Sequence, residues 1–463
     1  MTIAEPDTEI PRRIGGLGWL DIARLGLVQA SLGSVVVLTT STLNRVMVVE
    51  LALLAAIPGA LVGLHYAVQL LRPLWGHASD VGGSRTRWIV GGVGLLAVAG
   101  MMAAASVALM AEHFVLGLVI AVIAYTLIGF GIGAAGTSTL ALLASRTAPA
   151  RRPGAATLVW TLMIAGIVVT AATTGAFLDP FGFERLLGVT AVASISAFLL
   201  AVIAIAGIER RTTPVSVATG PAASTERGFT DALVDTWSDR EARLFTVFVF
   251  VSMLAYSAQD LILEPFGGAV HGMSPGETTQ LAGTQHGGVL LGMILVGTLG
   301  TWLARRRPGV LKATVAGGCV LSALALSGLA ASAAHPGVWP VSLNVFALGV
   351  ANGAFAVAAI GSMMALAAAG KGGAARAGIR MGVWGAAQAV AFGLGGLLGA
   401  VSVDLASRAA GLGAEGYALV FGVEASVFLV AAALAARLKL LGGGTTMTVV
   451  PDHDLATLAA NGR

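Results

Sequence analysis

Long apolar stretches alternate with short polar breaks along the whole chain. Twelve of these stretches reach the roughly 20 residues that a helix needs to cross the hydrocarbon core of a bilayer. They lie at residues 23–43, 51–72, 88–110, 114–144, 154–178, 184–208, 243–264, 280–303, 310–333, 338–369, 377–401 and 414–437. The pattern therefore predicts an all-α, polytopic membrane protein with twelve transmembrane helices.

The longest polar stretch divides these helices into six and six. It predicts an N-terminal bundle at residues 1–208, a cytoplasmic linker at 209–242, a C-terminal bundle at 243–440 and a cytoplasmic tail at 441–463. Within the linker, large apolar residues recur at every fourth position from Phe229, with aspartates between them. This spacing predicts a short amphipathic helix on the membrane surface, with a helix that docks another protein as the alternative.

An internal repeat supports the division into two bundles. A shift of 224 residues superposes Gly129 on Gly353 and Trp160 on Trp384 without a gap. Two parallel repeats of six helices, related by an axis along the membrane normal, describe the major facilitator fold. We therefore expect two pseudo-repeated six-helix bundles of that fold.

The composition excludes a soluble protein. Of the 463 residues, 56% are hydrophobic and only 11% are charged, whereas soluble domains carry about 25% charged residues. The 63 glycines favour closely packed membrane helices. The single cysteine, Cys319, permits no intrachain disulfide.

The basic residues predict the orientation in the membrane. Lys and Arg collect on the cytoplasmic side of membrane proteins. With the N-terminus placed inside, 24 of the 27 Lys and Arg residues fall on the cytoplasmic side, and only Arg45, Arg185 and Arg408 fall outside. Both termini are therefore predicted to be cytoplasmic. The net charge of +4 reflects this bias and is no evidence for nucleic-acid binding.

The break between the second and third predicted helices carries a recognisable motif. In the segment 72–87, Gly76, Asp80, Gly83 and Arg85 stand at the offsets of the loop 2/3 signature of the major facilitator superfamily, which this segment resembles. The resemblance implies that this loop, with Arg72, latches the two bundles together on the cytoplasmic side. The alternative interpretation is a positively charged membrane anchor.

Two further segments narrow the family. One is residues 42–51, TLNRVMVVEL, and the other is residues 255–268, AYSAQDLILEPFGG. Together with the loop 2/3 segment they resemble the PucC/LhaA family, the bacteriochlorophyll-delivery branch of the major facilitators, over essentially all twelve helices. The sequence of residues 259–266 and the glycine-rich loop favour the PucC group of this family, which serves the peripheral antenna.

The resemblance implies a function in photosynthesis. It implies an assembly factor for light-harvesting complexes in the inner, intracytoplasmic membrane of a purple phototrophic bacterium. The cargo would be bacteriochlorophyll, and the partners would be antenna polypeptides, the bacteriochlorophyll synthase and the lipid bilayer.

Ionisable residues within predicted helices indicate a functional site, because charge at membrane depth is costly. Asp260 and Glu264 are four residues apart and share one helix face, and Gln259 adds a polar group beside them. Aligning the two repeats places Arg45 opposite Glu264. We expect an ion pair that joins the bundles or gates the outer end of a cavity, with proton coupling as the alternative. Most membrane-depth charge is then predicted at the outer end, with an apolar interior below it. Two neighbours of Arg45 in the first segment belong to the same candidate set, namely Asn44 and Glu50.

Two histidines lie within predicted helices and are candidate axial ligands for the magnesium of a chlorin. They are His65 and His286. Imidazole serves as such a ligand because the chlorin itself supplies four nitrogens. The alternative for each is a hydrogen-bonded packing residue.

Two common motifs of catalytic sites are missing from the sequence. They are the phosphate-binding G-x-x-x-x-G-K-[ST] and the zinc motif H-E-x-x-H. We therefore predict a non-enzymatic protein that moves or presents bacteriochlorophyll. The rival hypotheses are an ion-coupled secondary transporter of a small solute and a structural chaperone that never contacts pigment.

Overall fold

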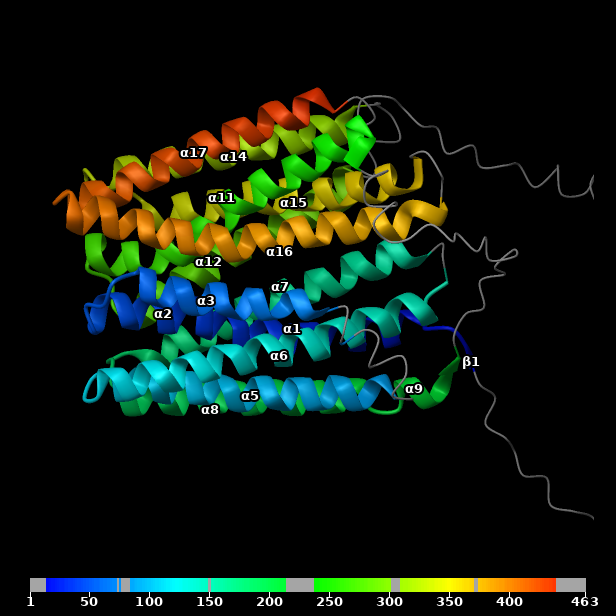
Figure 1. Cartoon of the computed structure of the whole chain (residues 1–463), viewed down its shortest axis with the longest axis horizontal. Helices are drawn as coiled ribbons and strands as arrows, with labels where there is room; N and C mark the ends of the chain where they lie inside the picture. Colours follow the sequence, from blue (N-terminus) through cyan, green and yellow to red (C-terminus); the bar gives the residue numbers. More distant parts are fainter. Residues whose placement is uncertain are drawn as a thin grey trace, which may run out of the picture.

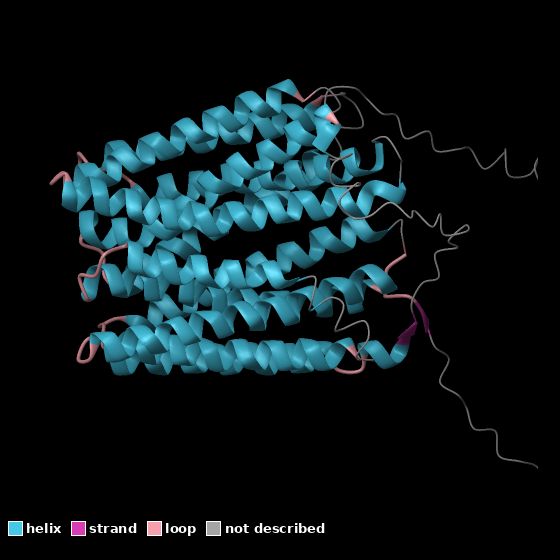
Figure 2. Ribbon diagram, in the orientation of Figure 1, coloured by secondary structure: helices cyan, strands magenta, loops and turns pink. Residues whose placement is uncertain are grey.

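The computed structural model describes residues 14–72, 75, 84–148, 151–213, 237–300, 309–369 and 374–438. Long helices run side by side in two stacked groups, one built from the N-terminal part of the chain and one from the C-terminal part (Figure 1). Strand structure in the described part is limited to one two-residue parallel pair, Ile14–Gly15 with Thr212–Thr213 (Figure 2). The predicted all-α fold of two helical bundles is confirmed.

The N-terminal half begins with a continuous helical segment whose hydrogen-bond pattern changes along its length. Its elements are α1 (Trp19–Val37), η1 (Leu38–Thr42), α2 (Leu43–Arg45) and η2 (Val46–Glu50), of which η1 and η2 are π-helical. The remaining helices of this half are α3 (Ala56–Val68) with η3 (Gln69–Leu71), α5 (Arg85–Met110), α6 (Phe114–Arg146), α7 (Arg152–Leu178), α8 (Phe183–Ile205) and the short α9 (Ile208–Arg211).

The C-terminal half has the same alternation of long helices. Its elements are α11 (Arg240–His271), α12 (Pro275–Leu295) with η5 (Val296–Gly300), α14 (Val310–Ser332), α15 (Val341–Ala369), α16 (Ala374–Asp404) with η6 (Leu405–Ala409), and α17 (Ala414–Arg437).

Eleven helices in the described part are long and apolar enough to cross a membrane. The remaining predicted span, the second along the chain at 51–72, forms the shorter apolar helix Ala56–Leu71. It begins late because the chain bends after Glu50, where Ala52 has a φ of 51°. Such a left-handed conformation interrupts a helix.

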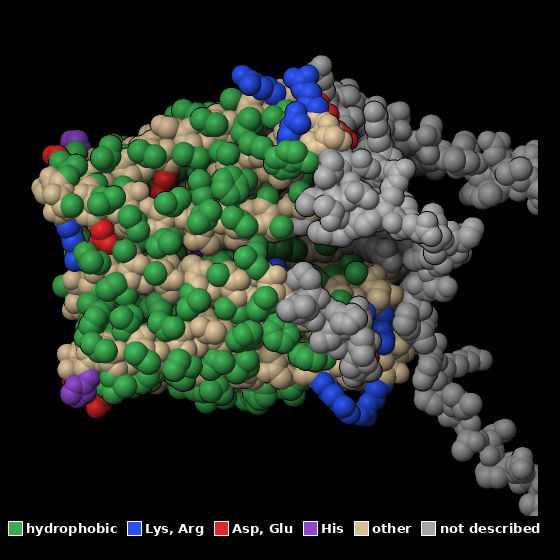
Figure 3. Space-filling model, in the orientation of Figure 1, with side chains coloured by type: hydrophobic (Ala, Val, Ile, Leu, Met, Phe, Trp, Pro, Cys, Tyr) green, Lys and Arg blue, Asp and Glu red, His purple; other side chains and the backbone are tan. Residues whose placement is uncertain are grey.

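The bundle has two ends, which we call the linker face and the distal face. The linker face carries α9, the start of α11 and the end of α17, and the distal face carries the opposite helix ends (Figure 1). Hydrophobic side chains cover the visible flank between them, and charged side chains gather mostly near the two ends (Figure 3). This distribution suits a protein whose flank faces lipid.

The packing of two glycines confirms the internal repeat. A Cβ added at Gly129 on α6 would lie 2.7 Å from the backbone oxygen of His65 on α3. A Cβ added at Gly353 on α15 would lie 2.1 Å from the backbone oxygen of Val289 on α12. The two glycines are 224 residues apart in the sequence, and so are the two residues that they contact, His65 and Val289. The same close helix contact therefore occurs in both halves, and α3 of one half corresponds to α12 of the other.

Candidate functional site

A cavity of about 330 Å³ lies between the two halves. Helices α1, α3, α6 and α7 line it from the N-terminal half, and α11, α12 and α16 line it from the C-terminal half. Its polar and aromatic lining residues are Gln29, Thr40, Ser41, His65, Tyr66, Gln69, Arg72, Trp160, Tyr256, Asp260, His286, Gln388 and Phe392. The structure thus brings both predicted histidines, from different halves, to one cavity.

The two histidines are held in the same way by their own helices. The Nδ1 atom of His65 lies 3.2 Å from the carbonyl oxygen of Val62, and that of His286 lies 2.9 Å from the carbonyl oxygen of Ala282. A carbonyl oxygen only accepts, so Nδ1 carries the proton and Nε2 carries the lone pair. The hydrogen bonds of these two histidines among the described residues are at Nδ1, and none is found at either Nε2. This arrangement orients imidazole for metal ligation, because the bond at Nδ1 fixes the ring.

Aromatic rings form one wall of the cavity. Tyr66 lies beside His65, with ring centroids 4.2 Å apart, and its ring is 5.6 Å from that of Phe392. Phe392 is in turn 5.9 Å from Tyr256. These rings come from α3, α16 and α11, so both halves contribute. A wall of this kind suits a flat conjugated ligand, since aromatic faces stack on one another.

Two ionisable residues line the cavity as well. Asp260 accepts a hydrogen bond of 3.0 Å from Nε2 of Gln285 on α12. It lies 11 residues before the distal end of α11, a rise of about 16 Å. Arg72, at the linker end of α3, donates to Oε1 of Gln69. The expectation that charge gathers at the outer end above an apolar interior is therefore wrong for this cavity, because α11 continues to His271 and places Asp260 deeper than predicted.

The residues around Arg45 join the two halves at the distal face. Arg45 is only 2% exposed and pairs with Glu50, and its other terminal nitrogen donates to the carbonyl oxygen of Met273 at 2.7 Å. Asn44 donates to the carbonyl oxygen of Leu261. The structure thus brings three of the six predicted residues into one distal network.

The predicted direct ion pair between Arg45 and Glu264 is wrong. Arg45 and Glu50 are five residues apart, and the π-helical turn η2 brings positions with that separation together. Arg45 therefore finds its carboxylate within its own half. Glu264 is 1% exposed and interacts with Arg45 only at longer range.

Glu264 and Gln259 occupy different surroundings from Asp260. Glu264 interacts electrostatically with the hydroxyls of Thr278, Ser41 and Thr279, but neither carboxylate oxygen meets hydrogen-bond geometry. Gln259 is 1% exposed, and its side-chain oxygen and nitrogen have no hydrogen-bond partner in the described part of the chain. It is not among the residues that line the cavity.

Three residues that sequence reasoning did not select also bridge the halves at the distal face. Asp404 accepts hydrogen bonds from the backbone nitrogens of Ala55 (2.9 Å) and Ala56 (2.7 Å), at the start of α3. Arg408 donates to the carbonyl oxygen of Leu53 at 2.6 Å. A carboxylate at a helix N-terminus is favourable because the backbone N–H groups there lack partners. The signal in the sequence was the pair of opposite charges at i and i+4 beside a predicted outer loop.

The third of these residues is Asp179, at the end of α7. It accepts hydrogen bonds from the hydroxyl of Ser274 (2.5 Å) and the backbone nitrogen of Gly276 (3.1 Å), which begin α12. The distal face is therefore joined by two carboxylates, each binding the N-terminus of a helix in the other half.

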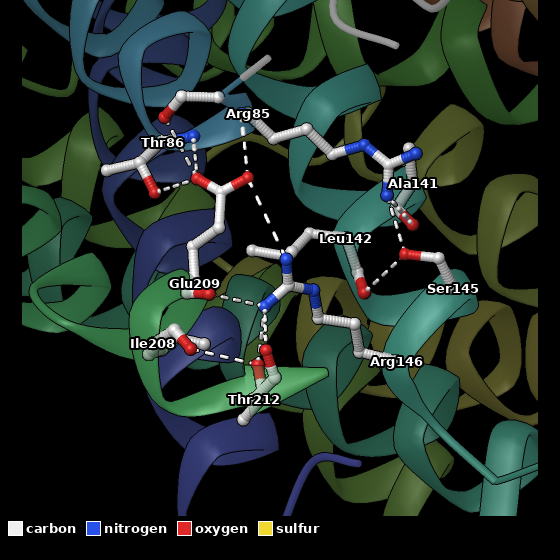
Figure 4. A network of polar contacts seen from close by, with 10 residues as sticks. Arg85, Thr86, Ala141, Leu142, Ser145, Arg146, Ile208, Glu209 and Thr212 are labelled. Carbon is white, nitrogen blue, oxygen red and sulfur yellow. Dashed lines mark hydrogen bonds and ion pairs between the residues drawn. The ribbon is translucent and has the colours of Figure 1, made fainter. Parts of the chain in front are cut away.

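The linker face holds a separate polar network within the N-terminal half (Figure 4). The carboxylate of Glu209 on α9 accepts hydrogen bonds from Ser84 and from the backbone nitrogens of Arg85 and Thr86, at 2.9–3.0 Å. Arg146 on α6 donates to the carbonyl oxygen of Glu209 at 2.6 Å. The predicted boundary at residue 208 thus falls just before a residue that caps α5.

The predicted latch residues are placed only in part. Arg85 donates to the carbonyl oxygen of Ala141 and to the hydroxyl of Ser145, both on α6 of the same half. Arg72 lines the cavity. Gly76, Asp80 and Gly83 lie outside the described residues, so the role of this loop as a latch stays a prediction.

Replacing Glu209 with Gln should destabilise the N-terminal half. The change removes the charge that accepts from the first turn of α5, and hydrogen bonds to charged groups contribute about 1.5–3 kcal/mol each. We expect a lower thermal unfolding midpoint of the detergent-solubilised protein. Glu112→Gln, on the exposed turn after α5, is the matched control and should leave the midpoint unchanged. Equal midpoints for the two variants would contradict the capping role.

The family is decided by a profile that covers most of the chain. The profile described as PUCC protein matches residues 42–442, which include every helix after η1 and cavity-lining residues from both halves. This chain belongs to the PUCC protein family.

Relatives of this PUCC-family chain come from purple bacteria. It is 50% identical to the "Bacteriochlorophyll synthase 44.5 kDa chain" of Rhodobacter capsulatus, over 94% of this chain and 99% of the relative. It is 29% identical to "Protein PucC" of Cereibacter sphaeroides, over 87% and 88% of the two chains. A protein of the puhA-bchM intergenic region of R. capsulatus is also 29% identical, over 89% and 88%. The membership is confirmed, and the choice of the PucC group stays a prediction.

Solved structures of transporters share the fold of this PUCC-family protein. A bacterial homologue of the human lysosomal transporter Spinster, in an inward-facing and unoccupied conformation, matches with a TM-score of 0.66 at 17% identity and covers 92% of this chain and 97% of its own. The nucleoside transporter NupG matches with a TM-score of 0.64 at 16% identity, covering 91% and 99%. The major facilitator fold is therefore confirmed, and these similarities speak to the fold alone.

Proposed function

We propose that this protein is an assembly factor for light-harvesting antenna complexes and that it holds bacteriochlorophyll in the cavity between its halves. The observation that carries the proposal is the pair His65 and His286, one from each half, whose Nε2 atoms are left without partners at one cavity. Bacteriochlorophyll contributes a magnesium ion with an open axial position, and the histidines would supply the ligand.

The repeat explains how two such ligands come to line one cavity. His65 lies on α3 and His286 on α12, the corresponding helices of the two halves. A ligand bound by both would be sensitive to how the halves sit relative to each other, because each half fixes one imidazole. Movement of the halves would then exchange or release the pigment, which is the behaviour that delivery requires.

Family membership supports a location in a photosynthetic membrane and partners from bacteriochlorophyll metabolism. Relatives are named for bacteriochlorophyll synthesis and for PucC. We propose the inner, intracytoplasmic membrane as the location, with both termini cytoplasmic, and antenna polypeptides and the bacteriochlorophyll synthase as partners. The apolar flank offers the surface on which transmembrane antenna helices would pack (Figure 3).

The proposal is tested by deletion and purification. A strain without this protein should accumulate fewer antenna complexes, measured from the near-infrared absorption of its membranes. The protein purified in mild detergent should carry bacteriochlorophyll, measured from its absorption spectrum after extraction. Normal antenna levels in the deletion strain would contradict the assembly role, and a pigment-free protein that still restores antenna would favour a chaperone without pigment.

A second candidate, an ion-coupled transporter of a small solute, is favoured by the charges in the cavity. Arg72 and Asp260 both line it, and charged residues in such cavities often bind substrates or coupling ions. Asp260→Asn separates the two functions. For a coupled transporter it should abolish proton-driven uptake in proteoliposomes, while a pigment carrier should keep its bound bacteriochlorophyll. Loss of pigment without any uptake in the parent protein would reject the transporter.

A further inference from the structure

The C-terminal half carries a second and larger cavity, of about 580 Å³, which the proposed function does not use. It is a groove between α11, α16 and α17, and we call it the lateral groove. Its floor consists of small residues, among them Ala258, Gly395 and Gly399. Its rim includes Leu398 and Val423, which are 51% and 55% exposed on the flank of the bundle. The groove therefore opens toward the lipid.

The lateral groove has the depth of one leaflet of a bilayer. Its lining on α16 and η6 runs from Gly395 to Ala406, a rise of about 16 Å, and on α17 from Leu419 to Val427, a rise of about 12 Å. The hydrocarbon core is about 30 Å thick, so a leaflet is about 15 Å. A transmembrane helix would need contacts over the full thickness, whereas a lipid-like molecule fits this length.

One ionisable group lies among the described residues of this apolar groove. Glu424 is 5% exposed, and neither of its carboxylate oxygens has a hydrogen-bond partner in the described part of the chain. No Lys, Arg or His is among the described lining residues. Glu424 lies ten residues into α17, about 15 Å from the distal end. An unpaired carboxyl group at this depth is costly unless a ligand compensates it.

We propose that Glu424 is an axial ligand for the magnesium of a bacteriochlorophyll that enters the lateral groove from the lipid; this inference rests on the proposed function. Magnesium prefers hard oxygen ligands such as carboxylate. The charge of the carboxylate would complement the metal, and the small apolar residues of the floor would contact the macrocycle or its tail. The protein then has a lipid-side site in addition to the histidine cavity.

The inference is tested with the full-length protein in lipid nanodiscs. His65→Phe and His286→Phe are introduced together, so that binding at the central cavity does not obscure the groove. The probes are bacteriochlorophyll a and bacteriopheophytin a, which differ in the presence of magnesium. We expect the magnesium pigment to bind at least tenfold more tightly, and Glu424→Gln to remove this preference. Glu415→Gln, an exposed carboxylate on the same helix outside the groove, is the matched control and should keep it.

The outcomes separate this inference from the proposed function. A magnesium preference that survives Glu424→Gln overturns the inference. Complete loss of binding in the double histidine variant, with binding intact in the parent protein, also overturns it and leaves the histidine cavity in place. Absence of binding in the parent protein overturns both. Glu424→Leu is the second variant, and binding of the magnesium-free pigment to it shows that the groove is still formed.

Discussion

Protein carrying both His65→Phe and His286→Phe should lose one bound bacteriochlorophyll per molecule. Phenylalanine keeps the flat ring but has no nitrogen to ligate magnesium, so the cavity would lose both candidate axial ligands. The hydrogen bonds that the two histidines make in the described structure are those at Nδ1, so the change breaks no other buried hydrogen bond of these residues. The measurement is the pigment-to-protein ratio after size-exclusion chromatography.

Single variants and a control define the result further. Each single change should weaken pigment binding about tenfold or more. Each half supplies one of the two ligands, so only the histidine of the other half would remain. His335→Phe, in the exposed turn after α14, removes a histidine far from the cavity lining and should have no effect. Any pigment that remains in the double variant should depend on Glu424. An unchanged pigment ratio in the double variant would reject the histidines as ligands.

The fold was predictable from the sequence because the lipid bilayer permits few backbone structures to span it. A spanning segment must satisfy its backbone internally, so an apolar run of sufficient length becomes a helix. The predicted spans 88–110 and 184–208 correspond closely to α5 and α8. The repeat was also readable, because Gly129 and Gly353 are fixed by the same steric contact in both halves. Helix ends were less predictable, and α11 extends to His271 rather than to residue 264.

The candidate site was predictable in its residue types more than in its pairings. His65 and His286 stood out because imidazole is rare at membrane depth, and the structure brings both to one cavity. The partner of Arg45 could not be predicted, since it depends on the π-helical turn that places Glu50 beside it. Helical periodicity of 3.6 residues does not reveal such a turn.

The bridging carboxylates were missed for a different reason. Asp404 binds backbone N–H groups of Ala55 and Ala56, which have no side-chain signature. A search for paired charges finds only its i+4 neighbour Arg408. Contacts between a side chain and a distant helix terminus depend on the tertiary arrangement of the halves, which the local sequence does not contain.

Replacing Asp404 with Ala should open the distal face. The variant leaves two N–H groups at the start of α3 without an acceptor, and each hydrogen bond to a carboxylate contributes about 1.5–3 kcal/mol. Because about 1.4 kcal/mol changes a population tenfold, the open form should gain tenfold or more. Thr42→Cys reports on opening, since the hydroxyl of Thr42 lies 3.1 Å from that of Thr279 in the other half.

The measurement is the rate at which a water-soluble maleimide labels the cysteine introduced by Thr42→Cys. Native Cys319 is fully buried, so background labelling should be low. Asp404→Ala should raise the rate at least tenfold, and Glu112→Ala, which removes an exposed carboxylate from the same face, should not. Since both halves supply a histidine to the cavity, the same variant should also lower pigment retention. Faster labelling with unchanged pigment would show that distal opening is independent of cargo binding, and an unchanged rate would reject Asp404 as a bridge that holds the halves together.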